Sequence, residues 1–359
     1  MSRHVVLHYL STILVTRVLL CSAAITGLLE LLTLLEQTTP ILQRHLGILG
    51  IVYYATLTLP SLISNALPAG MLIGSLFMLT QMTSSNEIPT LRAAGMSPLT
   101  LYKYLIPATL MIGFFGILLE DQIVPRSELA YHTWWNKTDP FSEKNSHAFW
   151  IQNGTQIIHI GSLSDGGQTL SNLDIYDRDL LTGLLIRTIH ANTAHYSDTH
   201  SWELQKTYRI QIEKQLLIHT LLQDKTRWFI RLTPHDFICL STENPSLSTW
   251  TILTMLYGHF PSTSPPAFLE TSVLERFFLP LFLCVLVFLT IPVIYIPPRA
   301  GFQNWTPIRC LAIGLALIVS QGLLRALGNA GILPPLVATL SGLVIFMLWV
   351  LNTLLRNEL

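Results

Sequence analysis

Two groups of side chains in this sequence are of types that carry chemistry. The first is a set of histidines, His190, His195 and His200, spaced five residues apart. A spacing of five fits neither one helix face nor one strand face, so we interpret them as packed or solvated histidines rather than metal ligands or bases. The second group is Glu120 and Asp121, at the end of an apolar run. A carboxylate pair at a membrane boundary could relay protons, but a wetted interfacial pair is the simpler interpretation.

Motifs for enzymatic chemistry are missing from the sequence. It contains no GxxxxGK[ST] phosphate loop, no GxSxG nucleophile motif and no HExxH zinc motif. Its cysteines follow no CxxC or Cys/His zinc spacing, and Cys21, Cys284 and Cys310 fall inside apolar runs. We therefore predict a chain with no catalytic residue, no metal and no cofactor of its own.

Charged residues inside the first apolar run are the next candidates, because charge is costly there and usually faces protein or a polar path. Arg17 and Glu30 lie in this run, and Glu36 follows it. Residues 30, 33, 34 and 37 share one helical face. Glu30 could simply extend to the membrane surface. Alternatively, this face is one wall of a path for an amphiphilic lipid, formed by Glu30, Thr33, Leu34, Gln37 and Arg44.

The composition is that of a membrane protein with one polar domain. Half of the 359 residues are hydrophobic, 12% are charged, and the formal net charge is zero. Apolar runs of eighteen or more residues predict spanning helices. The first run is too long for a signal peptide and lacks a suitably placed cleavage site, so we keep it as a span. A chain without net basic charge offers no surface for nucleic acid.

Six spans can be drawn, at residues 5–35, 47–82, 98–120, 274–296, 308–328 and 333–355. Alternating spans place most Lys and Arg near span ends on one side, namely Arg3, Arg92, Lys103, Arg299, Arg309 and Arg356. The opposite short loops offer only Arg44 and Arg325. Since cytoplasmic loops are enriched in these residues, we predict cytoplasmic termini and an extracytoplasmic segment at 121–269.

The sequence pattern of the segment 121–269 predicts a β domain. Strand-like alternation appears at 148–152, 155–160, 184–190, 194–197 and 207–212. Asn153-Gly154 predicts a hairpin turn, and Gly166-Gly167 and residues 198–200 predict further turns. We expect a sandwich, a jellyroll or an open barrel. An amphipathic helix is expected at 246–257, with Leu247, Trp250, Leu253 and Leu256 on its apolar face.

A short polar stretch between the second and third spans predicts a helix of about two turns at residues 86–96. Asn86 can cap it, Glu87 is an acid in its first turn, Pro89 suits an early position, and Gly95 can end it. Ile88, Leu91 and Ala94 then lie on one side. This could be an ordinary loop helix or a peg that docks into another protein.

Four stretches of the sequence resemble one known family, the LptF/LptG permeases of the lipopolysaccharide exporter. Asn86-Glu87 through Leu91-Arg92-Ala93-Ala94-Gly95-Met96-Ser97 is similar to the family's cytoplasmic coupling helix. Val124-Pro125 with Glu128 resembles the exit from the third span. Pro280-Leu281 through Ile291-Pro292, with Pro298-Arg299-Ala300-Gly301, resembles the fourth span and the loop after it. Leu324-Arg325-Ala326-Leu327-Gly328 through Leu333-Pro334-Pro335-Leu336 resembles the turn between the last two spans.

The resemblance implies a fold and a set of partners. The fold is an α-helical membrane protein with six transmembrane helices and an extracytoplasmic β-jellyroll-like domain between helices 3 and 4. The expected domains are 1–125 (helices 1–3), 126–268 (periplasmic β domain) and 269–359 (helices 4–6). The implied partners are an LptB-like ATPase dimer that binds the ATP and Mg, an LptF-like second permease, LptC-like and LptA-like periplasmic bridge proteins, and lipopolysaccharide. The implied location is the inner membrane of a Gram-negative bacterium.

The resemblance also assigns candidate roles to residues. In the family the coupling helix fits a groove on the ATPase, which implies coupling roles for Glu87, Ile88, Leu91, Arg92 and Gly95. Leu59-Pro60, Ala66-Leu67-Pro68 and Ile73-Gly74-Ser75-Leu76 look more like LptG than LptF. One departure stands out. Family members often place basic side chains at the outer end of the first span, where this chain has Glu30, Glu36 and Gln37.

Two other function classes compete with a transport role. An intramembrane enzyme that modifies lipids would use Glu120, Asp121 and the histidines, and would need them on one face. A membrane-anchored scaffold or sensor would bind a ligand through its β domain and would not need the helix around Glu87. Substitution of Glu87 and Arg92 separates this class from a transporter.

Overall fold

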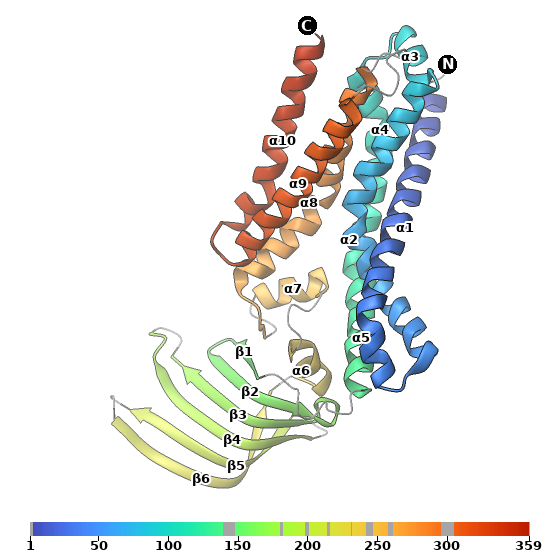
Figure 1. Ribbon diagram of the computed structural model, residues 1–359. Helices are drawn as coiled ribbons and strands as arrows, with labels where there is room; N and C mark the ends of the chain where they lie inside the picture. Colours follow the sequence, from blue (N-terminus) through green and yellow to red (C-terminus); the bar gives the residue numbers. More distant parts are fainter. Residues whose placement is uncertain are drawn as a thin grey trace. The chain divides into compact units, whose positions relative to one another are not determined.

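The computed structural model describes residues 3–138, 148–179, 182–197, 201–213, 216–230, 232–241, 247–257, 261–295 and 305–358. His200, Arg299 and the turn expected at 198–200 lie outside these residues. The chain divides into two compact units, Met1–Val124 with Pro266–Leu359, and Pro125–Pro265 (Figure 1). Each is described separately.

The first unit is built from long apolar helices. Six of the described helices are long and apolar enough to cross a membrane, which confirms the predicted number of spans. They are α1 (Arg3–Gln43), α2 (Gly47–Ser84), α4 (Pro98–Leu118), α8 (Pro266–Thr290), α9 (Thr306–Asn329) and α10 (Pro335–Glu358). The short α3 (Glu87–Ala93) lies between α2 and α4 in the chain, and the 3₁₀ turn η3 (Ile291–Tyr295) follows α8.

Several helix limits differ from those expected. Helix α1 continues to Gln43 through Pro40, and α8 begins at Pro266 rather than at 274. The π-helical turn η1 (Leu119–Ile123) follows α4 and leads directly into α5 (Val124–Lys137). Hydropathy marks only the apolar part of a helix, whereas backbone hydrogen bonding continues into polar residues.

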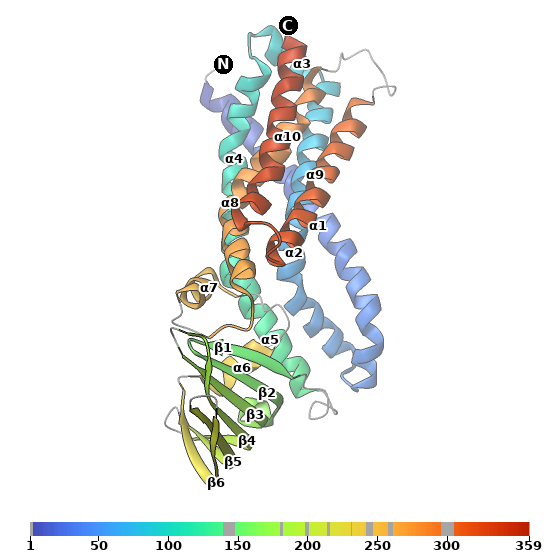
Figure 2. The same cartoon turned by 90° about the vertical axis from the view of Figure 1, so that its left-hand side faces the viewer.

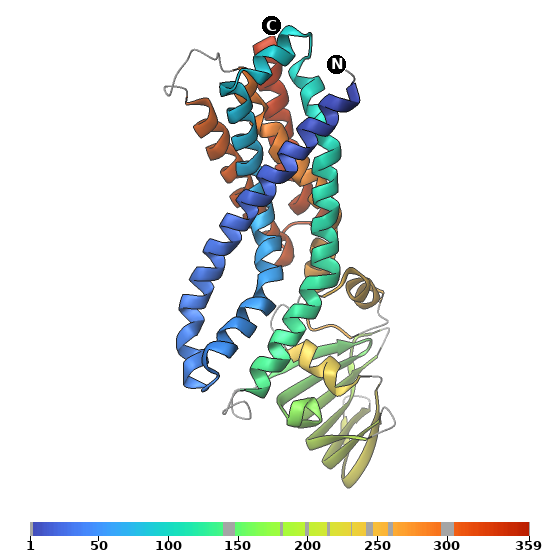
Figure 3. The ribbon, with the colours of Figure 1, turned by 90° about the vertical axis from the view of Figure 1, so that its right-hand side faces the viewer.

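Close packing of α1 against α2 depends on two glycines four residues apart. A Cβ added to Gly70 would lie 2.9 Å from the Cα of Ser22, and one added to Gly74 would lie 2.7 Å from the Cα of Val18. Small residues at this spacing let two membrane helices touch along their backbones. Figure 3 shows α1 and α2 running side by side.

A glycine also allows close backbone contact between α4 and α8. A Cβ on Gly113 would lie 2.7 Å from the Cα of Pro280. Around these contacts α1, α2, α4 and α8 share one apolar core, in which Leu10, Leu14, Met78 and Leu105 are fully buried. Shape-matched helix faces therefore hold these four helices of the first unit together.

The second unit contains one six-stranded antiparallel sheet whose strands follow each other in chain order (Figures 1 and 2). The strands are β1 (Phe149–Asn153), β2 (Gln156–Ser164), β3 (Thr169–Arg178), β4 (Leu185–Ser197), β5 (Ser201–Glu213) and β6 (Leu216–Phe229). Asn153 pairs with Gln156 across the predicted Asn153-Gly154 turn. The predicted jellyroll is not seen among the described strands, which form a single meander, because each strand pairs with its chain neighbour.

The second unit also contains nearly all of α5, the helices α6 (Pro234–Ser241) and α7 (Thr249–Leu256), and the 3₁₀ turn η2 (Asp165–Gly167). Trp202 is fully buried, contacts Phe237 of α6 edge to face, and donates its Nε1–H to the carbonyl of Leu232. The predicted apolar face of α7 is wrong at Trp250, whereas Leu253 and Leu256 are half-buried. Ile252 and Met255 are the buried residues, whereas Trp250 is 75% exposed. Both sides of this helix are apolar, so periodicity alone could not say which side packs.

Candidate functional site

Helix α3 forms in the short loop between α2 and α4 for reasons that are local. Asn86 has a left-handed backbone, and its carbonyl rather than its side chain starts the helix by accepting the Thr90 N–H. The expected Asn86 side-chain cap is therefore wrong. Pro89 is the third residue, where its missing N–H is not needed. Gly95, with φ +89°, ends the helix. Its backbone N–H donates to the carbonyl of Arg92, and the backbone N–H of Met96 donates to the carbonyl of Leu91.

The apolar side of α3 is used inside the chain. Ile88 is fully buried in the core of the first unit, and Leu91 is partly buried against the same core. Ala94, expected on the same side, is exposed. In this structure Ile88 anchors α3 to its own chain and is not available to a partner. The surface that α3 offers outward consists of polar and small residues, namely Asn86, Thr90, Arg92, Ala93 and Ala94.

Both charged side chains of α3 contact other helices of the unit. The Tyr9 hydroxyl of α1 donates to Glu87 Oε2 at 2.9 Å, and the Ser85 hydroxyl donates to Glu87 Oε1 at 2.9 Å. Arg92 Nη1 donates to the carbonyl of Ile294 at 3.5 Å, and its guanidinium lies 5.2 Å from the centroid of the Tyr295 ring. Helix α3 is thus attached on one side to the start of α1 and on the other to η3.

The predicted polar face of α1 is half-buried along its length. Glu30 Oε1 accepts a long hydrogen bond from Thr58 of α2 at 3.4 Å. Glu30 Oε2 is buried, and no described residue donates to it. The Thr33 hydroxyl donates to the backbone carbonyl of Glu30, so it is turned toward its own helix. Leu34, Gln37 and Arg44 are also half-buried. Glu30, Thr33, Leu34 and Gln37 lie within α1, whereas Arg44 lies in the turn that follows it.

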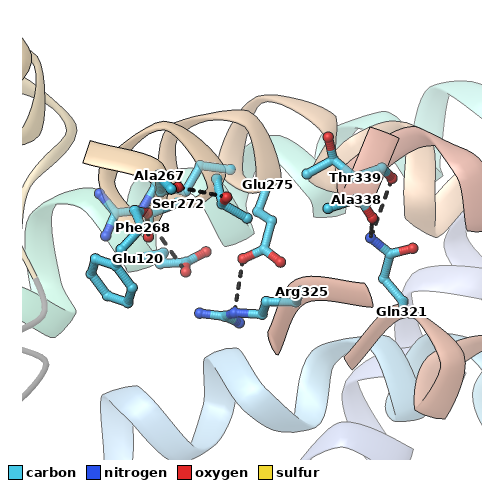
Figure 4. A network of polar contacts seen from close by, with 11 residues as sticks. Glu120, Ala267, Phe268, Ser272, Glu275, Gln321, Arg325, Ala338 and Thr339 are labelled. Carbon is cyan, nitrogen blue, oxygen red and sulfur yellow. Dashed lines mark hydrogen bonds and ion pairs between the residues drawn. The ribbon is translucent and has the colours of Figure 1, made fainter. Parts of the chain in front are cut away.

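A second group of charges lies where α8 meets η1 and α9 (Figure 4). Arg276, only 8% exposed, has Nε 3.9 Å from Glu120 Oε1 and Nη1 3.6 Å from Asp121 Oδ1. The preceding residue, Glu275, forms an ion pair with Arg325 of α9, with 3.0 Å between Glu275 Oε2 and Arg325 Nε. Adjacent residues of α8 therefore pair with different elements, Arg276 with η1 and Glu275 with α9. Glu120 and Asp121 pair with an arginine, an arrangement of a structural ion cluster rather than of a catalytic pair.

Sequence reasoning missed Glu275 and Arg276. The available signal was two adjacent charges inside an apolar run, which is costly unless both are paired. The acidic partners of Arg276 lie in the π-helical turn η1, a local distortion that the apolar pattern of the third span did not predict. Nearby, Gln321 of α9 donates to the carbonyl of Thr339 of α10 at 3.2 Å (Figure 4).

The histidines do not form a site together. His190 pairs with Asp174 at 2.5 Å, and His159 pairs with the other oxygen of Asp174 at 3.2 Å. His195 contacts the hydroxyl of Thr169 at 3.2 Å instead. Within the described part of the chain, no group of three or more His, Cys, Asp or Glu side chains could hold a metal ion. His159, His190 and His195 each contact a side chain of a neighbouring strand.

Comparison with known proteins gives the chain a family. Residues 8–356 match the family described as lipopolysaccharide export system permease LptF/LptG. No curated protein matches the chain. The family match covers both units and includes α3 as well as the sheet. Six membrane-spanning helices, a separate antiparallel sheet and this match together show that the chain is a multi-pass membrane protein of the LptF/LptG family of lipopolysaccharide export permeases.

Proposed function

We propose that this chain is the LptG-like permease of an exporter that extracts lipopolysaccharide from the inner membrane and passes it to a periplasmic bridge. Its partners are an LptB-like ATPase dimer, an LptF-like second permease, and LptC-like and LptA-like bridge proteins. The choice of LptG over LptF rests on the second-span residues 59–76. The observation that carries the transport proposal is α3, whose polar residues face outward while Ile88 fixes it to the core.

In this proposal the chain transmits motion and performs no catalysis. The ATPase binds ATP and Mg, and its closure moves α3 together with α2 and α4. Glu87 and Arg92 make the polar contacts with the ATPase, Leu91 contributes at the edge of the interface, and Gly95 sets the end of the helix. Discrete packings of the spans with different lipid affinity convert this movement into extraction.

The lipid path is proposed to run beside α1. Glu30, Thr33, Leu34, Gln37 and Arg44 form its polar side. Because each buried CH₂ contributes roughly 0.8 kcal/mol, several acyl chains cannot cross water unaided. An apolar groove in the β domain would replace the bilayer as their solvent. Since Glu30 takes the place of a basic residue, the cations for an anionic lipid head come from the partner permease, or the head carries fewer phosphates.

The proposed topology places both termini and α3 in the cytoplasm and the β domain in the periplasm. The distribution of Lys and Arg near the span ends supports this orientation. The family to which the chain belongs supports an inner-membrane location.

A binding experiment tests the role of α3. The variant Glu87→Ala/Arg92→Ala is purified in mild detergent, and the co-purifying ATPase is quantified. A matched control is Glu203→Ala/Lys225→Ala, which removes an acid and a base that pair at 2.8 Å on the sheet. We expect the first variant to lose most of the ATPase and the control to keep it. Full ATPase assembly and export in the first variant would contradict the transport proposal.

A further inference from the structure

The Tyr9–Glu87 hydrogen bond joins two elements that are 78 residues apart in the sequence. Tyr9 lies in the first turns of α1 and is 47% exposed, beside the buried Val6 and Leu10. The hydrogen bond to Glu87 therefore fixes the Tyr9 hydroxyl next to a stretch of α1 that is anchored in the core. Among the described residues, this hydrogen bond is the polar link between α1 and α3.

The Glu87 carboxylate has room for a further donor. An ionised carboxylate offers about four acceptor positions. Tyr9 occupies one on Oε2, and Ser85 occupies one on Oε1. A donor from a docked protein can therefore bind Glu87 without displacing Tyr9. The carboxylate can then connect three bodies: the partner, α3 and α1.

Helix α1 is long and continuous, so a movement of α3 that reaches Tyr9 can be carried along it. It is one helix from Arg3 to Gln43, and Pro40, near its end, is the only proline inside it. Its backbone touches α2 at Val18 and Ser22. Tyr9 lies nine residues before Val18, and Glu30 lies twelve residues after it. At 1.5 Å per residue, these are arms of about 14 Å and about 18 Å on either side of the contact.

We propose that Tyr9 is a positioning residue that transmits the movement of α3 to α1, with the contact at Val18 and Ser22 as the pivot. This inference rests on the proposed function, because it assumes that a partner moves α3. It adds a specific route: a pull on Glu87 tilts α1, and its outer half, which carries Glu30, moves in the opposite direction. Tyr9 has no role in binding the partner itself.

The test uses the complete complex in lipid discs with Tyr9→Phe, which removes only the hydroxyl. A matched control is Tyr102→Phe, because the Tyr102 hydroxyl also links two helices, donating to the carbonyl of Cys284 at 3.0 Å. Three quantities are measured: ATPase co-purification, ATP hydrolysed, and lipopolysaccharide released per ATP. The same quantities are measured for Tyr9→Phe in a Glu87→Ala background.

We expect Tyr9→Phe to retain the ATPase but to lower lipid release per ATP roughly fivefold, the scale of one hydrogen bond's net contribution to an equilibrium. In the Glu87→Ala background the same substitution should have no added effect, because the two residues act as one link. A release ratio equal to that of Tyr102→Phe, or an ATPase loss as large as that of Glu87→Ala, would overturn the inference. Failure of the proposed function is distinguishable, because Glu87→Ala would then itself leave ATPase binding and release unchanged.

Discussion

A Cβ on Gly74 of α2 would lie 2.7 Å from the Cα of Val18 of α1. The two helices therefore touch along their backbones at a point where no larger residue fits. Gly70 repeats this contact one turn earlier, against Ser22. Helix α1 also buries Leu10 and Leu14 in the shared core, so the backbone contact and this core together hold α1 against α2.

Gly74→Ala should destabilise the protein, by about 1–3 kcal/mol, the usual cost of overpacking. A suitable control is Gly322→Ala in α9, because nothing lies within 4 Å of a Cβ at that position. By helix propensity alone the control should be neutral or slightly stabilising. Thermal unfolding in detergent compares the two variants. Equal midpoints would show that α1 and α2 are not in contact at Gly74.

Arg276→Met should cost more stability than Arg325→Met. The Arg276 side chain is 9% exposed and faces two carboxylates, whereas the Arg325 side chain is 51% exposed. Breaking a buried pair by removing one partner costs about 3–5 kcal/mol. Loss of Arg276 leaves two carboxylates without their cation, whereas loss of the half-exposed Arg325 leaves only Glu275 without its partner. Thermal unfolding midpoints of both variants measure the two losses of stability, and Arg276→Met should have the lower midpoint. The reverse order would contradict the buried cluster at η1.

Trp202→Ala should unfold the second unit, because loss of a large buried aromatic side chain costs about 3–5 kcal/mol. Trp202→Phe keeps most of the ring packing and loses the hydrogen bond to Leu232, worth about 1 kcal/mol. Trp250→Ala is the control, since its side chain is exposed and surface changes stay within about 0.5 kcal/mol. Limited proteolysis of the full chain ranks the three variants, with Trp202→Ala expected to be cleaved fastest and Trp250→Ala slowest. Equal cleavage of all three variants would argue against the described core.

Glu30→Lys should increase the lipopolysaccharide retained by the purified complex, because a cation would then face the anionic lipid head. Glu36→Lys makes the same charge reversal on an exposed residue of the same helix and should change retention little. Bound lipid per complex is measured by mass spectrometry after purification. If Glu30→Lys leaves lipid binding and transport unchanged, Glu30 does not lie on the path.

The sequence was most informative where the signal is local. Apolar runs predicted six spans, and Pro89 and Gly95 predicted the helix now seen as α3, because length and backbone conformation depend on nearby residues. The side of a helix that packs depends instead on distant elements. The sequence could therefore not show that Ile88 is buried in its own core, or that Ile252 rather than Trp250 packs in α7.

Non-local pairing explains the other differences. A jellyroll and a meander use the same alternation within strands and differ only in which strands pair. Likewise, Glu275 and Arg276 are visible in the sequence as charges, but their partners come from η1 and α9. The ion cluster arises only when three segments meet. For the same reason the Tyr9–Glu87 bond could not be predicted from either segment alone.

The most direct test of the central claim is affinity purification of this chain from mild detergent, with identification and counting of what co-purifies. We expect two copies of an ATP-binding subunit and one second six-span permease of the same family. A second permease that resembles LptF would also support the LptG assignment. Recovery of the chain alone, stable and without ATPase activity, would contradict the transport function and favour a scaffold or sensor.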